Sequence, residues 1–370
     1  MGAGVRRPGA GVRQRPAAQP SLCTRRRRAA ARPARARRRA HAGDPGVTKP
    51  PPPLDVVTLG ESMALFAAEQ PAPLAEVRHF TKRLAGAETN VAIGLCRLGL
   101  RVGWISRLGA DSFGDFVQRT VAGEGVDCSQ LVIDPARPTG FMLKTLSPDG
   151  ADPQVEYYRK GSAASAMQVA QLDESYLLSA RHLHATGIFA ALAPNTFEYC
   201  EHSMQRARAA GRSVSFDPNL RPSLWASQAQ MIAGINRLAR TASWVMPGIA
   251  EGRLLTGRDS PEDIAAHYLD QGAQVVVIKL GAEGAYYATR AGEAGHVAGV
   301  KVPKVVDTVG AGDGFAAGLI SAQLEGLAWP AALERANWIG AQAIQVRGDM
   351  EGLPYRHQLG SVMKRQTSSL

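Results

Sequence analysis

Short apolar runs alternate with segments of helical spacing over most of this chain. The runs LDVVTLGE from Leu54, RVGWISRLG from Arg101 and QVVVIKLG from Gln274 predict buried strands. The segments 88–100 and 111–126 have apolar residues at helical spacing and lead into glycines, which predicts helices. Strands that alternate with helices through short links predict an α/β fold, with a doubly wound, mostly parallel sheet covered by helices.

Residues 141–160 do not follow this alternation. Two stretches with partly alternating polarity flank the turn-rich segment SPDGADP at 147–153, which predicts a β-hairpin outside the main sheet. We interpret it as part of a small β lid, formed by about 64–84 and 138–162, within one domain over 54–360. In such sheets ligands bind beyond the carboxyl ends of the strands, and the lid is expected beside that edge.

The positive charge of the chain is concentrated at its N-terminus. The 370 residues carry a net charge of +11, but residues 1–50 alone carry +13, from thirteen Arg and one Lys against Asp44, and the remainder carries −2. The 1–50 segment is rich in Arg, Ala and Pro, so we expect a disordered tail. Three interpretations compete: an arm that binds nucleic acid or another polyanion, a targeting peptide, or a start assigned too early. We favour the third, with initiation near Val47.

The cysteines and the hydropathy exclude several classes of protein. Cys23, Cys96, Cys128 and Cys200 are widely spaced and form no CxxC pair, so neither a zinc site nor a disulfide framework is indicated. No stretch reaches the roughly 18–20 apolar residues of a membrane span. We therefore expect a reduced, cytoplasmic protein without a membrane partner.

The segment VDTVGAGDGF at 306–315 carries the clearest candidate chemistry, between a strand-like run at 300–306 and a helix-like segment. Its residues Gly310, Ala311 and Gly312 lead into the helix, so their amides are expected to form an anion hole for a phosphoryl group. Asp313 then has a role as the general base that accepts a proton from a substrate hydroxyl. A simple helix cap is the structural alternative for Asp313.

The same segment resembles a known motif. DTVGAGDGFAAG is similar to the C-terminal motif of the ribokinase-like, or PfkB-type, sugar kinases, and LAGAETNVAIGLCRLG at 84–99 resembles their N-terminal glycine-rich substrate motif. The resemblance extends over nearly all of 54–357. It implies a ribokinase-like three-layer sandwich with a mostly parallel central sheet and a small β lid. It also implies ATP-dependent phosphorylation of an alcohol group, and favours a homo-oligomer.

Within this family, three segments resemble the 2-keto-3-deoxygluconate kinases: VEYYRKGSAAS at 155–165, FDPNLRPSLW at 216–225 and GDMEGLP at 348–354. Fructokinases share the second segment, so a fructokinase or other ketose kinase is the alternative. Arg159 and Arg221 favour an acidic sugar, because a guanidinium group binds both oxygens of a carboxylate. The expected reaction is the conversion of 2-dehydro-3-deoxy-D-gluconate to its 6-phosphate. Polyanion or nucleic-acid binding through the basic arm is the alternative from a different class.

The resemblance also implies two sets of binding residues. The residues implied for the sugar are Gly86, Asn90, Phe141, Tyr157, Arg159 and Arg221. Those implied for the nucleotide are Asn219, Lys279, Gly281, Gly284 and Asn337. Each has an ordinary structural alternative, such as a helix start for Asn90, packing for Tyr157 or a tight turn for the glycines.

The resemblance also implies two kinds of ion at the site. Mg²⁺ is expected to bridge the ATP phosphates, with Glu251 acting on it indirectly. Asp307 and neighbouring carbonyls are implied as a site for a monovalent cation such as K⁺. The sequence departs from the family pattern at Gly248, where relatives have Asn, at Ala85, where they have Gly, and at Phe141, where they often have Tyr.

Overall fold

The computed structural model describes residues 53–146 and 153–360. The expected N-terminal tail over 1–50 lies outside the described residues, as does most of the turn-rich segment at 147–153. No helix of the described residues is long and apolar enough to cross a membrane.

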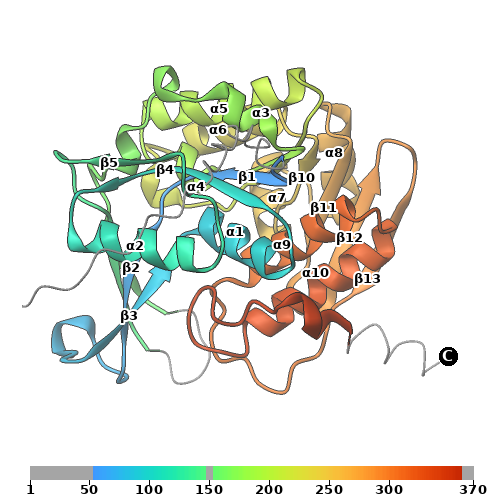
Figure 1. Ribbon diagram of the computed structural model, residues 1–370. Helices are drawn as coiled ribbons and strands as arrows, with labels where there is room; N and C mark the ends of the chain where they lie inside the picture. Colours follow the sequence, from blue (N-terminus) through green and yellow to red (C-terminus); the bar gives the residue numbers. More distant parts are fainter. Residues whose placement is uncertain (1–52, 147–152, 361–370) are drawn as a thin grey trace, which may run out of the picture. The chain divides into compact units, whose positions relative to one another are not determined.

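A large sheet of nine strands runs through the described part of the chain (Figure 1). In spatial order these are β13 (Ala294–Ala298), β12 (Gly284–Thr289), β11 (Val275–Lys279), β10 (Trp244–Val245), β9 (Ser213–Asp217), β8 (His182–Thr186), β1 (Val56–Leu59), β4 (Val102–Gly109) and β5 (Leu131–Asp134). Neighbours from β11 to β5 are parallel, whereas β12 pairs in the antiparallel sense with both β11 and β13. The predicted mostly parallel sheet is confirmed.

Helices cover both faces of this sheet (Figure 1). One layer contains α1 (Ala87–Arg97), α2 (Ser112–Gly123), α9 (Ala311–Leu324) and α10 (Trp329–Ala343). The other contains α3 (Glu174–Ser179), α4 (Gly187–Ala190), α5 (Pro194–Ala209), α6 (Gln228–Ala239), α7 (Ile249–Thr256) and α8 (Pro261–Asp270). Val56 and Val57 are neighbours on β1 but belong to the cores of different layers, because successive side chains of a strand point to opposite faces.

A second, smaller sheet contains four described strands in the order β3 (Phe80–Ala85), β2 (Met63–Ala68), β6 (Phe141–Lys144) and β7 (Val155–Tyr158). The pair β6–β7 is antiparallel and corresponds to the predicted hairpin. A small apolar cluster that includes Met63, Leu65 and Met142 lies on this sheet. The closing of this sheet over a substrate remains a prediction.

The segment at 300–306 is not the strand that its apolar residues suggest. It has no regular secondary structure, and Val300 and Val305 are 39% and 37% exposed. Pro303 lacks an amide for a sheet ladder, and the lysines on either side of it favour solvent. The run is therefore a connection from β13 to α9, and its apolar residues have no sheet to pair with.

Candidate active site

A cavity of about 310 Å³ is lined by the smaller sheet, by the carboxyl ends of β9 and β11, and by the start of α9. This is the edge of a parallel sheet at which ligands are expected. The predicted site residues that line it are Gly86, Asn90, Tyr157, Arg159, Asn219, Arg221, Glu251, Lys279, Gly310, Gly312 and Asp313. Residues from distant parts of the sequence thus meet in one place.

The other predicted residues are not part of this lining, namely Phe141, Gly281, Gly284, Asp307, Ala311 and Asn337. The Phe141 ring stacks on Tyr158 with centroids 4.6 Å apart, so it packs among aromatic side chains of the smaller sheet. The Asn337 amide nitrogen donates to the carbonyl oxygens of Val297 (3.2 Å) and Ala298 (3.0 Å), which ties α10 to β13. The sugar, phosphoryl and nucleotide contacts implied for these residues remain predictions.

The start of α9 is shaped by a glycine. Gly310 caps the helix with φ of +84°, and a Cβ at this position would lie 2.3 Å from the carbonyl oxygen of Asp349. Glycine adopts this conformation without strain, and it alone leaves this space free of a Cβ. The first amides of α9, including that of Gly312, have no acceptor within the helix and lie at the cavity. This arrangement favours an anion at the helix start.

Asp313 projects from the first turn of α9 toward α1. The Asn90 side-chain nitrogen donates to its Oδ2 at 2.8 Å. Burial raises the pKa of Asp313 to about 6, against the Asn90 hydrogen bond, which lowers it. The Asp217 charge raises this pKa further, whereas Lys279 and Arg221 lower it. A carboxyl group with a pKa near neutrality suits proton transfer in a cell.

Beside Asp313 lies an ion pair of which the sequence indicated only one member. The Lys279 ammonium lies 2.6 Å from Oδ2 of Asp217, and the Asp217 side chain is buried. Lys279 was predicted to contact the nucleotide, whereas Asp217 was not among the predicted site residues. Its position as the last residue of β9 was the available signal, because strand ends of this sheet meet at the site.

The two arginines expected to recognise a carboxylate differ in their surroundings. Arg159 is buried and already paired, since its Nε and Nη2 lie 2.6 Å and 2.5 Å from Oε2 of Glu61. Ser162 donates a short hydrogen bond to the other oxygen of Glu61. Arg221 is partly exposed and forms no ion pair with any carboxylate of the described residues, and its Nη1 donates to the carbonyl oxygen of Leu220 at 2.8 Å. The guanidinium of Arg221 therefore has N–H donors available for a substrate carboxylate.

Glu88 is a second buried carboxyl group that sequence reasoning missed, although it lies inside the glycine-rich motif. It accepts a 2.6 Å hydrogen bond from Oγ1 of Thr186, and burial raises its pKa to about 7. A Cβ at Gly60 would lie 2.3 Å from its carboxyl carbon, so glycine makes room for this side chain. Glu88 lines the cavity as an acid that stays largely protonated below neutral pH.

The residues present are compatible with a magnesium ion that is held mainly by nucleotide phosphates. Both oxygens of Glu251 accept main-chain amides, from Leu220 at 2.7 Å and from Gly248 at 2.8 Å. The described residues contain no group of three or more acidic, His or Cys side chains suited to a metal. Mg²⁺ commonly keeps several waters and uses one or two carboxylates in phosphate sites, which fits an indirect role for Glu251.

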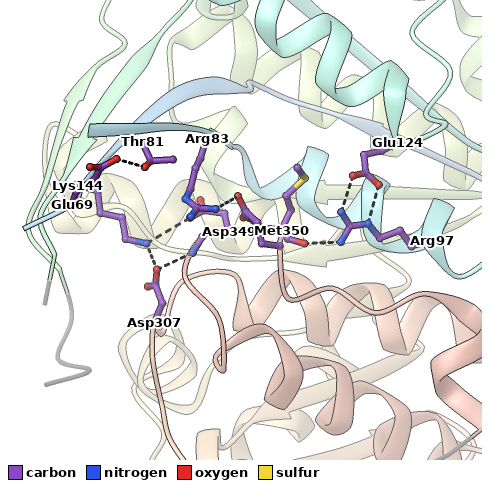
Figure 2. Close-up of polar contacts among 11 residues, drawn as sticks. Glu69, Thr81, Arg83, Arg97, Glu124, Lys144, Asp307, Asp349 and Met350 are labelled. Carbon is purple, nitrogen blue, oxygen red and sulfur yellow. Dashed lines mark hydrogen bonds and ion pairs between the residues drawn. The ribbon is translucent and has the colours of Figure 1, made fainter. Parts of the chain in front are cut away.

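Asp307, the implied site of a monovalent cation, has a protein cation beside it. The Lys144 Nζ lies 2.6 Å from Oδ2 of Asp307 and 3.7 Å from Oδ1 of Asp349 (Figure 2). Asp307 does not line the main cavity, but Lys144 and Asp349 do. None of the motifs quoted from the sequence included Lys144, and its partners follow it by 163 and 205 residues.

The chain matches known proteins over nearly all of the region described. Residues 54–356 match the model of the pfkB family of carbohydrate kinases. A 2-dehydro-3-deoxygluconokinase of Bacillus subtilis (strain 168) is 52% identical over 314 residues, which are 85% of this chain and 96% of that protein.

Solved structures agree with this match. A PfkB protein from Polaromonas sp. JS666 is 55% identical with a TM-score of 0.77, and covers 83% of this chain and 99% of its own. A putative ribokinase II from E. coli, in complex with ATP and Mg²⁺, is 27% identical with a TM-score of 0.77 over 84% of this chain and 99% of its own. A fructokinase variant from Vibrio cholerae O395, with fructose, ADP and potassium bound, is 29% identical with a TM-score of 0.73. It covers 84% of this chain and 98% of its own.

Proposed function

Because the chain belongs to the pfkB family of carbohydrate kinases, we propose that it transfers the γ-phosphoryl group of ATP to the 6-hydroxyl of 2-dehydro-3-deoxy-D-gluconate. The observation that carries this choice of substrate is the 52% identity to the B. subtilis 2-dehydro-3-deoxygluconokinase over 96% of that protein. The guanidinium of Arg221 lies at the cavity and forms no ion pair with a carboxylate of the described residues, which supports an acidic sugar independently of that likeness.

The geometry suggests how the chain performs the transfer. Asp313 accepts the proton of the attacking hydroxyl while the oxygen–phosphorus bond to the sugar forms and the bond to ADP breaks. The amides at the start of α9 stabilise the charge on the transferred phosphoryl group. Lys279, held by Asp217, adds a positive charge on the same side. Mg²⁺, when bound with ATP, neutralises phosphate charge.

In this proposal Arg221 binds the sugar carboxylate and Arg159 shapes the site. An arginine binds a carboxylate through two parallel hydrogen bonds, which requires donors that are not already committed. Arg221 meets that requirement, whereas Glu61 takes up two donors of Arg159. The other N–H groups of Arg159 can still donate to a hydroxyl or carboxylate oxygen, but the charge of Arg159 is already balanced by Glu61.

The test is a coupled assay of ADP release by the purified full chain with 2-dehydro-3-deoxygluconate, fructose and ribose. We expect turnover with the sugar acid above all. Arg221→Met should raise the KM for the sugar acid about 10- to 100-fold, because a hydrogen-bonded charge pair is lost, and should leave fructose turnover unchanged. The control is Arg212→Met, which changes an exposed arginine outside the cavity lining. A higher kcat/KM for fructose in the wild type would instead identify a ketose kinase.

Two further properties belong to the proposal. We place the reaction in the cytoplasm, where ATP is supplied. We also propose a homo-oligomer, since the outer strand β7 of the smaller sheet carries Tyr157 and Tyr158 with 42% and 49% exposure. Sedimentation velocity on the full chain measures this assembly state directly.

A further inference from the structure

Lys144 is a buried ammonium group at a junction between two parts of the fold. It is the last residue of β6 in the smaller sheet, and its side chain is only 5% exposed. Its partner Asp307 lies three residues before Gly310, the cap of α9. Asp349, its second neighbour, lies on a nearby loop, and the main-chain carbonyl oxygen of Asp349 packs against Gly310. Figure 2 shows Lys144 reaching down to Asp307 with Asp349 beside them.

These contacts disagree with a free monovalent cation at Asp307. Oδ1 of Asp307 accepts the amide of Val309 at 3.2 Å, and Oδ2 accepts the amide of Gly348 at 3.3 Å in addition to the ammonium of Lys144. Both oxygens are therefore taken by nitrogen donors. A K⁺ ion bound to Oδ2 would lie within a few ångströms of Nζ, where two like charges with little water between them repel strongly.

We propose that the Lys144 ammonium acts as a tethered monovalent cation, which positions Asp307 and the start of α9 so that the enzyme needs no added K⁺. This inference rests on the proposed function of the same site. Lys144 is a positioning residue, because it acts on the anion hole through Asp307 and Asp349 rather than by contact with the reacting atoms.

The charge of Lys144 is needed because the carboxylates around it are buried. Asp307 and Asp349 have side chains that are 10% and 6% exposed. Burial raises the pKa of Asp349 to about 7, Lys144 lowers it, and the charges of Asp313 and Asp307 raise it again. Without a cation, Asp307 and Asp349 repel each other on the two segments that meet at Gly310. The helix start, and the amides that receive the phosphoryl group, then lose their fixed position.

A tethered charge differs from a bound ion in a measurable way. A free ion leaves when its concentration falls, whereas the ammonium of Lys144 is present in every folded molecule. The wild type should therefore show the same activity in any monovalent salt. A variant without the ammonium should respond to ions that are small enough to replace it.

The experiment compares the full-length wild type, Lys144→Ala and Lys160→Met in choline, sodium, potassium and ammonium chloride at equal ionic strength. Lys160 is the matched control, an exposed lysine beside the same hairpin and outside the cavity lining. Turnover is measured with ATP, Mg²⁺ and the sugar acid. Thermal unfolding without substrates is the second measurement, because an ion that binds the folded state raises its melting temperature.

We expect wild type and Lys160→Met to change less than about 2-fold among the salts. Lys144→Ala should lose about 10- to 100-fold in kcat in choline, as supporting charges around a site commonly do, and recover part of it in potassium or ammonium. Its melting temperature should rise in the same two salts. Three results would overturn the proposal: activation of the wild type by K⁺, full activity of Lys144→Ala in choline, or a slow Lys144→Ala that no ion improves. Failure of the proposed function would look different, since the wild type would then phosphorylate no sugar acid in any salt.

Discussion

At the scale of single residues, the ionisation state of Asp313 decides whether the proposed reaction proceeds. The pKa of Asp313 is raised to about 6, first by burial. A general base works only when it is ionised, so activity is present above this pKa and lost below it. We expect kcat/KM to be constant above about pH 7 and to fall roughly tenfold per pH unit below about pH 6, since kcat/KM reports the free enzyme.

Asn90 provides a variant that shifts this profile. Its hydrogen bond lowers the pKa of Asp313, so Asn90→Ala should move the inflection to higher pH, whatever it does to the maximal rate. The measurement is kcat/KM from pH 5 to 9 with excess Mg²⁺. An inflection that stays in place in Asn90→Ala would assign the titration to another group, such as Glu88, whose pKa burial raises to about 7.

At the scale of elements, α9 offers a comparison between its two ends. Gly310 precedes the helix with φ of +84°, and Gly326 follows it with φ of +80°. An added Cβ meets the carbonyl oxygen of Asp349 at 2.3 Å at the first position and nothing within 4 Å at the second. A residue with a Cβ would therefore meet the same backbone strain at both positions. Only at Gly310 would its Cβ also meet a neighbouring atom.

Comparing Gly310→Ala with Gly326→Ala should separate the cost of a left-handed backbone from the effect of displacing the start of α9. Each alanine adopts a left-handed conformation at a cost of about 1 kcal/mol. We expect Gly326→Ala to lose about that much stability in urea unfolding and to keep its turnover. Gly310→Ala should lose more stability and at least about 100-fold in kcat, because the anion hole moves. Equal turnover in the two variants would argue that the start of α9 holds no phosphoryl group.

Some helices and strands could be predicted from local sequence patterns alone. Strands such as β11 and capped helices such as α8, which begins after Ser260 with Pro261 in its first turn, follow from local residues. The run at 300–306 was misjudged because β-branched residues alone do not provide a partner strand. A short apolar run becomes a strand only where a sheet edge is available.

At the scale of the whole molecule, the motifs located the cavity but not its charge balance. Gly86, Asn90 and Asp313 stand in local patterns, and the parallel sheet brings them together. The ion pairs of Lys144 and Asp217 became visible only in the structure, because each has its partner far away in the sequence. The pairing of Arg159 with Glu61 was equally hidden, and it shifts the expected carboxylate binding to Arg221.

The division of charge along the chain leads to the last prediction. Residues 1–50 carry +13 and the remainder −2, whereas the match to the pfkB family begins at residue 54. If the kinase lies within 54–360, deletion of residues 1–46 should leave kcat/KM within about 2-fold of the full chain. Affinity of the full chain for RNA or heparin depends on cationic side chains and should weaken steeply with salt. The deletion should abolish that affinity, as measured by fluorescence anisotropy with labelled RNA. Retention of RNA binding by the shortened chain would place the polyanion site on the kinase domain, and loss of turnover would show that the catalytic unit extends into the N-terminal segment.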